Sequence, residues 1–263
     1  MNYETLQVLI ENGVCTIRMN RAEVRNAFNE TMIAELTQAF QAADADAGVR
    51  ALVLAGAGPA FCAGADLNWM KKMAGYSLEE NRADALQLAT MLNTIYRMKK
   101  PTLARVHGAA FAGGMGLVAA CDIALAAEEA EFCLSEVKLG LTAATISPYV
   151  VAAMGERNAR RYFLTAERFS AAEALRIGLI HGLVPMTQLD ASVDTLLAHL
   201  LAASPAAIAA SKQLIRRVAR GAIDQDMIAD TAARIAAARA SADGKEGVRS
   251  FLEKRKPSWT GPR

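Results

Sequence analysis

Two turns rich in glycine and alanine are the first candidates for a chemical site. One spans residues 61–67 and follows a short apolar run at 51–55; the other spans 108–117 and leads into an apolar helix-like stretch. Small residues let a ligand approach the backbone, and a helix that starts in such a turn exposes unpaired N–H donors at the positive end of its dipole. This pattern predicts a site for an anion or oxyanion. A tight turn and close helix-to-strand packing are the alternatives.

Glu136 is the carboxylate most suited to acid–base chemistry. It lies in residues 132–140, a segment that is otherwise mostly apolar. Apolar neighbours can strip water from a carboxyl group, which raises its pKa and makes it an acid or base usable near neutral pH. The nearby Lys138 favours the alternative, an exposed glutamate on an edge strand.

The composition limits the classes of ligand. The chain has 263 residues, 53% of them hydrophobic, and a net charge of +2, which favours small molecules over nucleic acid or an anionic membrane. Neither the Gly-x-Gly-x-x-Gly spacing of dinucleotide sites nor a phosphate-binding Gly-Lys-Ser/Thr is present in the glycine turns. The four cysteines form no C-x-x-C pair, so no zinc site or disulfide framework is indicated, and the N-terminus lacks the pattern of a signal peptide. We therefore expect no metal, no membrane and a cytoplasmic location.

Strand-like and helix-like segments alternate in the first half of the chain. Runs at 6–10 and 14–19 flank Asn12-Gly13 and predict a hairpin, and Asn29 can cap a helix with one apolar stripe. The run at 51–55 is apolar on both faces, as in a buried parallel strand. This order predicts an α/β core. The further segments expected are a helix at about 79–98, strands at 102–106, 123–126 and 131–133, and a helix from residue 113 to 120.

The second half of the chain is expected to be helical. Ser170 and Glu173 have the spacing of a capping box, and helices are expected at about 187–203, 205–219, 222–240 and 243–256. We divide the chain into a core at 1–200 and a helical C-terminal region at 201–263.

Taken together and in this order, these segments resemble the crotonase, or enoyl-CoA hydratase/isomerase, superfamily. The resemblance runs from Arg25–Phe28 through both glycine turns and residues 135–140 to residues 251–255. It implies a core of repeated ββα units wound as a superhelix, with a helical C-terminal trimerisation region. It also implies a homotrimer or a hexamer built as a dimer of trimers, an acyl-CoA substrate, and no cofactor besides the coenzyme A that the substrate carries.

The resemblance also assigns roles to residues. It implies that the backbone amides of Ala65 and Gly113 hold the thioester oxygen and that Glu136 moves protons. Coenzyme A is then expected to contact Arg25, Ala27, Ala63, Asp66 and Leu67, with Ala63 and Asp66 near the adenine, and Phe251 and Lys254 from a neighbouring subunit. The alternative for Lys254 is a solvated basic end to the last helix.

One position departs from the two-carboxylate hydratases of this superfamily. Gly116 stands where they carry a glutamate. Residues 133–169 and 66–70 nevertheless resemble bacterial methylglutaconyl-CoA hydratases of leucine catabolism, which tend to share this glycine. The implied function is hydration of a branched, carboxylated enoyl-CoA such as 3-methylglutaconyl-CoA. The alternatives are an enoyl-CoA isomerase, which needs one carboxylate, an isohexenylglutaconyl-CoA hydratase, and more remotely a non-catalytic acyl-CoA-binding protein.

Two features of the acyl pocket stay open at this level. Residues 68–78 form either a mobile wall of the pocket or a surface helix whose Trp69 faces the core. A substrate carboxylate would need a cation, and Arg97, Lys138 and Arg160 are all candidates.

Overall fold

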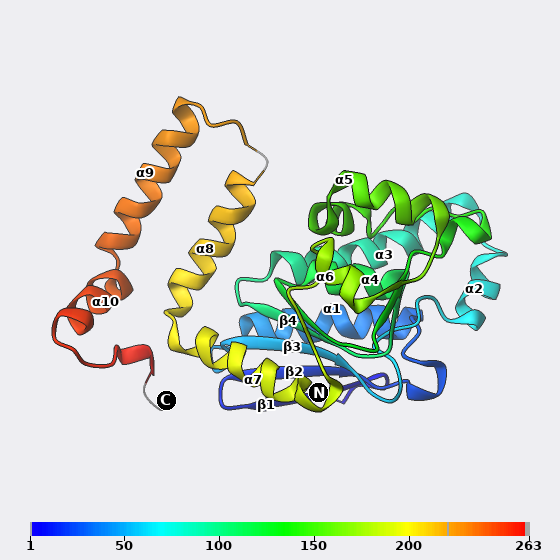
Figure 1. Ribbon diagram of the computed structural model, residues 1–263, viewed down its shortest axis with the longest axis horizontal. Coiled ribbons are helices and arrows are strands. Elements are labelled where there is room, and N and C mark those ends of the chain that lie inside the picture. Colours follow the sequence, from blue (N-terminus) through cyan, green and yellow to red (C-terminus); the bar gives the residue numbers. More distant parts are fainter. Residues whose placement is uncertain (1, 220, 261–263) are drawn as a thin grey trace.

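The computed structural model describes residues 2–219 and 221–260, and its centre is a six-stranded sheet (Figure 1). The first two strands are antiparallel, as the Asn12-Gly13 turn predicts, and every later pairing in this sheet is parallel. The order in the sheet is β1 (Leu6–Glu11), β2 (Val14–Met19), β3 (Ala51–Gly56), β4 (Thr102–Val106), β6 (Ile123–Ala127) and β9 (Gly182–Val184). A second sheet contains β5 (Ala109–Phe111), β7 (Glu131–Cys133) and β8 (Phe169–Ser170).

Helices follow the strands in chain order. The core carries α1 (Glu30–Ala45), α2 (Leu67–Met73), α3 (Leu78–Arg97), α4 (Gly113–Ala120), α5 (Ser147–Thr165), α6 (Ala171–Arg176) and α7 (Met186–Ala202). Short 3-10 helices are η1 (Ala22–Val24), η2 (Glu136–Leu139) and η3 (Ser258–Thr260). The C-terminal arm, as we call α8 (Pro205–Val218), α9 (Gln225–Ala240), α10 (Ala242–Leu252) and η3, completes the described chain.

The strands and helices repeat as ββα units. β4 joins the large sheet, β5 the small one, and α4 follows; β6, β7 and α5 repeat this order after the intervening η2. The predicted α/β core of ββα units is thus confirmed. β5 and β7 pair in parallel, so their carboxyl ends lie at the same edge of the small sheet. The segments that follow them, α4 after β5 and η2 after β7, therefore begin near that edge.

Two apolar layers cover the large sheet. β3 is buried along its whole length, as predicted, with Leu52 and Leu54 in one layer and Ala51 and Val53 in the other. The first layer contains the apolar stripe of α1 and residues of α3, α4 and α5, and the second contains α7. Asn29 caps α1 by accepting a hydrogen bond from the amide of Met32 at 2.9 Å, as predicted.

Several predicted boundaries needed correction. The helix expected from residue 222 begins at Gln225, because Asp224 accepts a hydrogen bond from the Met227 amide and caps it. The helix expected to reach residue 256 ends at Leu252, and Lys254 then turns the chain with a φ of 53°. The capping box at Ser170 is half formed, since Ser170 caps α6 but the Glu173 carboxylate binds Tyr162 and Arg176 instead.

The C-terminal arm extends away from the large sheet (Figure 1). Its first helix is attached to the core by the buried Lys212, whose ammonium contacts Asp122 Oδ2 at 2.5 Å and the Lys100 carbonyl at 2.7 Å. Further out, large apolar side chains such as Ile223 (90% exposed) and Leu252 (73%) face solvent. No single helix within the described ranges is long and apolar enough to span a membrane; α7 and α8 meet that criterion only jointly, across a bend of 103°.

Candidate active site

The segment that contains Ala65 is fixed on one side by Phe28. The Phe28 amide donates to the Gly64 carbonyl at 2.7 Å, and the Asp66 amide donates to the Phe28 carbonyl at 2.8 Å. In a parallel bridge of this kind, the residue between the two bonded groups directs its own N–H to the opposite side. The Ala65 N–H therefore points away from Phe28, and it has no hydrogen-bond partner among the residues that the structure describes.

Gly113 opens α4 with a second free amide. The residue before it, Ala112, adopts φ 48° and ψ −117°, a strained conformation for a residue with a side chain. The Ala112 carbonyl accepts from the amide of Met115 at 3.0 Å, which starts the helix. Within the described part of the chain the Gly113 amide has no partner, as expected for the first turn of a helix.

The two free amides lie on segments in contact. A Cβ at Gly113 would come within 2.5 Å of Phe28 Cε2, so the ring of the residue that fixes Ala65 also packs on Gly113. A Cβ at Gly64 would come within 3.2 Å of the Ala112 Cβ. The structure thus brings into contact the two segments that carry these free amides, one of them at a helix N-terminus where negative charge is stabilised.

A backbone hydrogen bond at the end of the small sheet links the segment that contains Glu136 to this site. The Ala112 amide donates to the Cys133 carbonyl at 2.8 Å, and Glu136 begins η2 three residues beyond Cys133. Its Oε2 is buried and has no hydrogen-bond partner among the residues that the structure describes. Burial raises the pKa of Glu136, against a smaller lowering by its own amide. The segment is a 3-10 helix, so the alternative of an edge strand is wrong.

Gly116 lies one turn into α4, where Ile146 fills the space beside it. A Cβ at Gly116 would lie 2.3 Å from Ile146 Cγ2 and 2.9 Å from Ile146 Cβ, both far inside normal contact. Leu92 of α3 lies on the same side, at 3.5 Å from that Cβ. The missing side chain at residue 116 is therefore replaced by an apolar wall, and the chain has no room there for a second carboxylate.

The sequence profile of the enoyl-CoA hydratase/isomerase family matches residues 9–262. The chain belongs to this family. Similar solved structures include an enoyl-CoA hydratase from Shewanella pealeana (44% identity, TM-score 0.95, covering 97% of this chain and 96% of that one). Another is Pseudomonas aeruginosa AtuE (37% identity, TM-score 0.94, covering 98% and 100%).

Relatives of this hydratase/isomerase include both named activities. Enoyl-CoA hydratase AKT6-1 of Alternaria alternata is 34% identical over 97% of this chain and 82% of its own length. The peroxisomal Delta(3,5)-Delta(2,4)-dienoyl-CoA isomerase of Arabidopsis thaliana is 30% identical over 98% of each chain. The protein is therefore an enzyme with enoyl-CoA hydratase/isomerase activity.

In this hydratase/isomerase, three of the residues predicted to contact coenzyme A lie at one turn, namely Arg25, Ala27 and Ala63. The Ala63 amide donates to the Arg25 carbonyl at 3.0 Å, and Ala27 is buried just after Arg25. Arg25 and Asn26 both adopt positive φ, and the Asn26 side chain holds this turn by bonding to the carbonyls of residues 57 and 60. The Arg25 side chain stays exposed, where it can meet an anionic ligand.

Asp66 and Leu67 differ in their access to a ligand. Asp66 is 4% exposed, and its carboxylate contacts Arg21 at 2.8 Å and the amides of Asn68 and Trp69. Burial would raise the pKa of Asp66, but these hydrogen bonds outweigh it and lower that pKa. Leu67 is 73% exposed. The carboxylate predicted to lie near the adenine is thus engaged within the protein.

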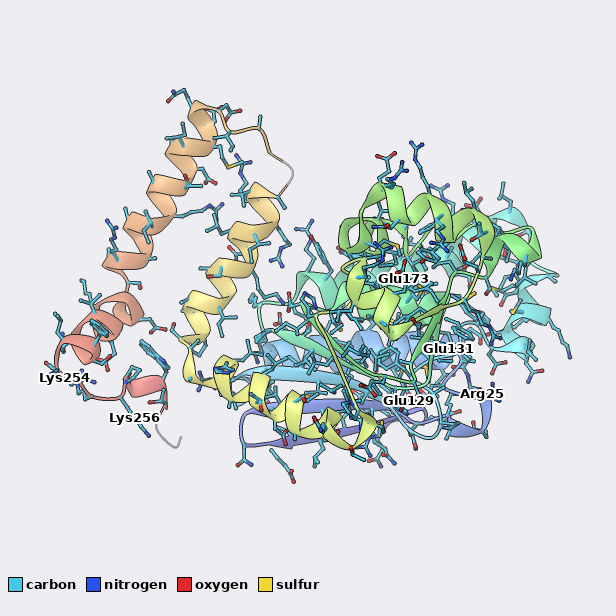
Figure 2. All side chains as sticks on the ribbon, viewed as in Figure 1. Arg25, Glu129, Glu131, Glu173, Lys254 and Lys256 are labelled. Carbon is cyan, nitrogen blue, oxygen red and sulfur yellow. The ribbon has the colours of Figure 1, made fainter. Side chains whose placement is uncertain are left out.

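Phe251 and Lys254 lie at the other end of the subunit. Figure 2 shows Lys254 on the C-terminal arm, far from Arg25. Phe251 is 81% exposed on α10. Within one chain the structure does not bring these two residues to the site.

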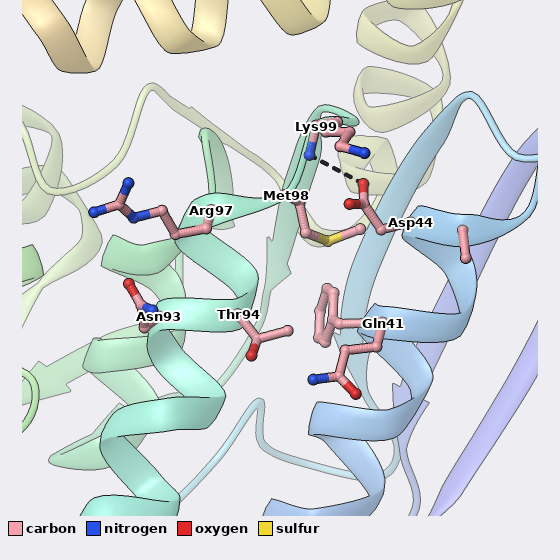
Figure 3. Close-up of a pocket in the computed structure, with 9 residues that line it drawn as sticks. Gln41, Asp44, Asn93, Thr94, Arg97, Met98 and Lys99 are labelled. Carbon is pink, nitrogen blue, oxygen red and sulfur yellow. Dashed lines mark hydrogen bonds between the residues drawn. The ribbon is translucent and has the colours of Figure 1, made fainter.

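The three alternative cations for a substrate carboxylate lie on three different elements, α3, η2 and α5. Arg97 lines a cavity of about 360 Å³ between α1 and α3, where Asp44 accepts from the Lys99 amide (Figure 3). Arg160 is paired with Glu156 at 2.6 Å, and Lys138 is exposed in η2, two residues after Glu136.

The segment at 68–78 contains most of the helix α2, and its role as a mobile wall of the acyl pocket stays a prediction. α2 buries Trp69, as the surface-helix alternative required, and the Trp69 indole donates to Asp84 of α3 at 3.2 Å. Sequence reasoning gave no role to Phe28 or Ile146. Phe28 belongs to the Arg25–Phe28 segment that resembles the family, whereas nothing in the neighbouring sequence marks Ile146, which meets Gly116 from 30 residues away.

Proposed function

We propose that this enzyme is a hydratase for a branched, carboxylated enoyl-CoA such as 3-methylglutaconyl-CoA, in leucine and isovalerate breakdown. The observation that carries the chemistry is the buried Oε2 of Glu136, which has no hydrogen-bond partner among the described residues and lies three residues beyond the Cys133 carbonyl that binds the Ala112 amide, next to Gly113. The resemblance of residues 133–169 to methylglutaconyl-CoA hydratases supports the substrate class.

In the proposed reaction, a single carboxylate handles both protons. The ionised Glu136 takes a proton from water as the water oxygen bonds to the β carbon, and the double-bond electrons move to the thioester oxygen. The amides of Ala65 and Gly113 hold this oxyanion, and donors of this kind are typically worth about 3–4 kcal/mol each in the transition state. Glu136, now protonated, returns the proton to the α carbon, so that one water is added in total.

The raised pKa of Glu136 suits this double role. A carboxyl group of ordinary pKa is a weak base and, once protonated, gives its proton back too readily to bulk water. A pKa closer to the working pH balances the two steps. The absence of a hydrogen bond to Oε2 leaves a lone pair that no donor in the described part of the chain occupies.

A second candidate function is double-bond isomerisation, and the Gly116–Ile146 contact favours it. With an apolar wall in place of a second carboxylate, the site has one fewer group to hold water. Glu136 would take a proton from the α carbon of a β,γ-enoyl thioester and return it to the γ carbon, with the same oxyanion donors. Hydration of the isohexenyl analogue, isohexenylglutaconyl-CoA, uses the first mechanism with a longer acyl group.

We also propose a homotrimer, or a hexamer of two trimers, in the cytoplasm. The exposed apolar side chains of the C-terminal arm support association, because large apolar surfaces on a single chain favour burial against a partner. Within one chain, Phe251 and Lys254 lie far from the turn at Arg25 and Asn26 (Figure 2). This fits the proposal that they contact the coenzyme A bound to a neighbouring subunit. Size-exclusion chromatography with light scattering tests this, and a monomer would contradict it.

The function is tested by product mass. Purified enzyme is mixed with 3-methylglutaconyl-CoA and, separately, with a β,γ-unsaturated acyl-CoA. Hydration adds one water to the first, whereas isomerisation leaves the mass of the second unchanged and moves its double bond. Glu136→Gln should lower turnover by about 100-fold or more, within the usual range for a general acid–base. Glu131→Gln, an exposed glutamate on the neighbouring β7, is the matched control and should keep activity.

If neither substrate is converted, the remote alternative of a non-catalytic acyl-CoA-binding protein gains support. If Glu136→Gln keeps full turnover of a converted substrate, the assigned role of Glu136 is wrong.

A further inference from the structure

The Asp66 carboxylate is built into the protein beside the first oxyanion donor. It directly follows Ala65, is 4% exposed, and caps α2 by accepting from the amides of Asn68 at 2.7 Å and Trp69 at 3.4 Å. Its second oxygen accepts from Arg21 Nη2 at 2.8 Å. A buried carboxylate with three donors is constrained in position, since each bond limits a different direction of movement.

Arg21 connects this carboxylate to the segment around Phe28, which is bridged to Ala65. Its Nη1 donates to the Ala27 carbonyl at 2.7 Å, next to Phe28, and its own amide donates to the Asn26 side chain at 2.9 Å. Phe28 in turn bonds to Gly64 and Asp66 on either side of Ala65. The guanidinium therefore joins the two segments whose alignment sets the direction of the Ala65 N–H.

We propose that Arg21 and Asp66 are a pair of positioning residues that aim the Ala65 amide at the thioester oxygen. This rests on the proposed function, in which Ala65 is an oxyanion donor. The pair acts through the backbone and does not touch the substrate, so it replaces the expectation that the Asp66 side chain contacts the adenine. Since the oxyanion interaction strengthens in the transition state, loss of the pair lowers kcat more than it changes KM.

Asp66→Asn is the first test. Asparagine keeps the size of the side chain and is itself a good helix cap, so α2 can form, but the charge opposite Arg21 is lost. We expect kcat to fall about 10-fold to 100-fold, in line with the effect of small misplacements in an active site, while KM changes less than about threefold. Arg21→Lys keeps a cation near Asp66 but loses the second guanidinium nitrogen, which binds the Ala27 carbonyl. Its kcat should lie between those of wild type and Arg21→Met.

The second readout is the absorption spectrum of bound cinnamoyl-CoA. Donors aimed at the thioester oxygen polarise the conjugated chain and shift its absorption to longer wavelength. The shift should shrink in Asp66→Asn and in Arg21→Met. Ser77→Ala is the control, because Ser77 caps α3 with a comparable hydrogen bond but has no link to Ala65. It should leave the shift unchanged.

Unchanged kcat and unchanged absorption shift in both Asp66→Asn and Arg21→Met would overturn the proposal. A raised KM with unchanged kcat would also overturn it, in favour of direct contact with coenzyme A. If wild type shows the shift but converts no enoyl-CoA, the proposed function fails while the spectra of the variants still decide the role of the pair.

Discussion

The contact between Gly116 and Ile146 gives the sharpest prediction about this protein. Adding a methyl group in Gly116→Ala places carbon 2.3 Å from Ile146 Cγ2, where an ordinary carbon contact is about 3.5–4.0 Å. Overpacking of this kind costs about 1–3 kcal/mol, whereas replacing glycine by alanine inside a helix gains about 0.5–1 kcal/mol. The free energy of unfolding should therefore fall by about 1–2 kcal/mol in Gly116→Ala.

Ile146→Ala alone removes a buried side chain and should cost about 2–5 kcal/mol. In the double variant, the contact of 2.3 Å with Ile146 Cγ2 is gone, while the Cβ at residue 146 stays 2.9 Å from the new methyl group, so the two changes compensate each other in part. The double variant should be more stable than the sum of the single changes by about 1–3 kcal/mol.

The assay is thermal or urea unfolding at one fixed protein concentration, because association adds to apparent stability. Ala143→Gly, at a buried position three residues before Ile146, serves as a second partner for Gly116→Ala, because Ala143 comes no nearer than 3.5 Å to a Cβ at residue 116, and should give additive effects. Additivity within about 0.5 kcal/mol for the Gly116–Ile146 pair would refute the reasoning that Ile146 occupies this space.

Three further predictions concern titratable groups. Glu136→Gln should be more stable than wild type at pH 7, since burial raises the pKa of Glu136 in the folded state; thermal unfolding should show this gain vanish below about pH 4, where the unfolded chain is also protonated. Glu173→Ala should cost about 1–3 kcal/mol at pH 7 by removing the acceptor of the buried Tyr162 hydroxyl. Hydrogen bonds from Arg176 and Tyr162 lower the pKa of Glu173 to about 2, so in unfolding curves this difference should shrink as pH falls from about 4 to 2, and a constant difference would contradict it. The buried cysteines, with the pKa of Cys62 and Cys121 raised to about 12, should resist a thiol reagent at pH 8 until denaturant exposes all four.

Much of the site was accessible from local sequence because it is made of backbone. Glycine and alanine in residues 61–67 and 108–117 indicate turns that leave amides free, and the helix that starts at Gly113 is visible in its apolar composition. Glu136 stood out because its neighbours are apolar, and burial does raise its pKa. Contact of coenzyme A with Phe251 and Lys254 stays a prediction, since one chain places these residues in and just after α10 of the C-terminal arm.

The sequence by itself determined the α/β order, the buried strand β3, the hairpin and the two turns, because hydrophobic period, caps and glycine act over a few neighbouring residues. Tertiary structure decided that Asp66 faces Arg21 and that Ile146 replaces a side chain at Gly116. These contacts join residues 30 to 45 positions apart in the chain, and their existence depends on how the helices pack on the sheet. Local patterns fix which segments form, while packing fixes which side chains meet.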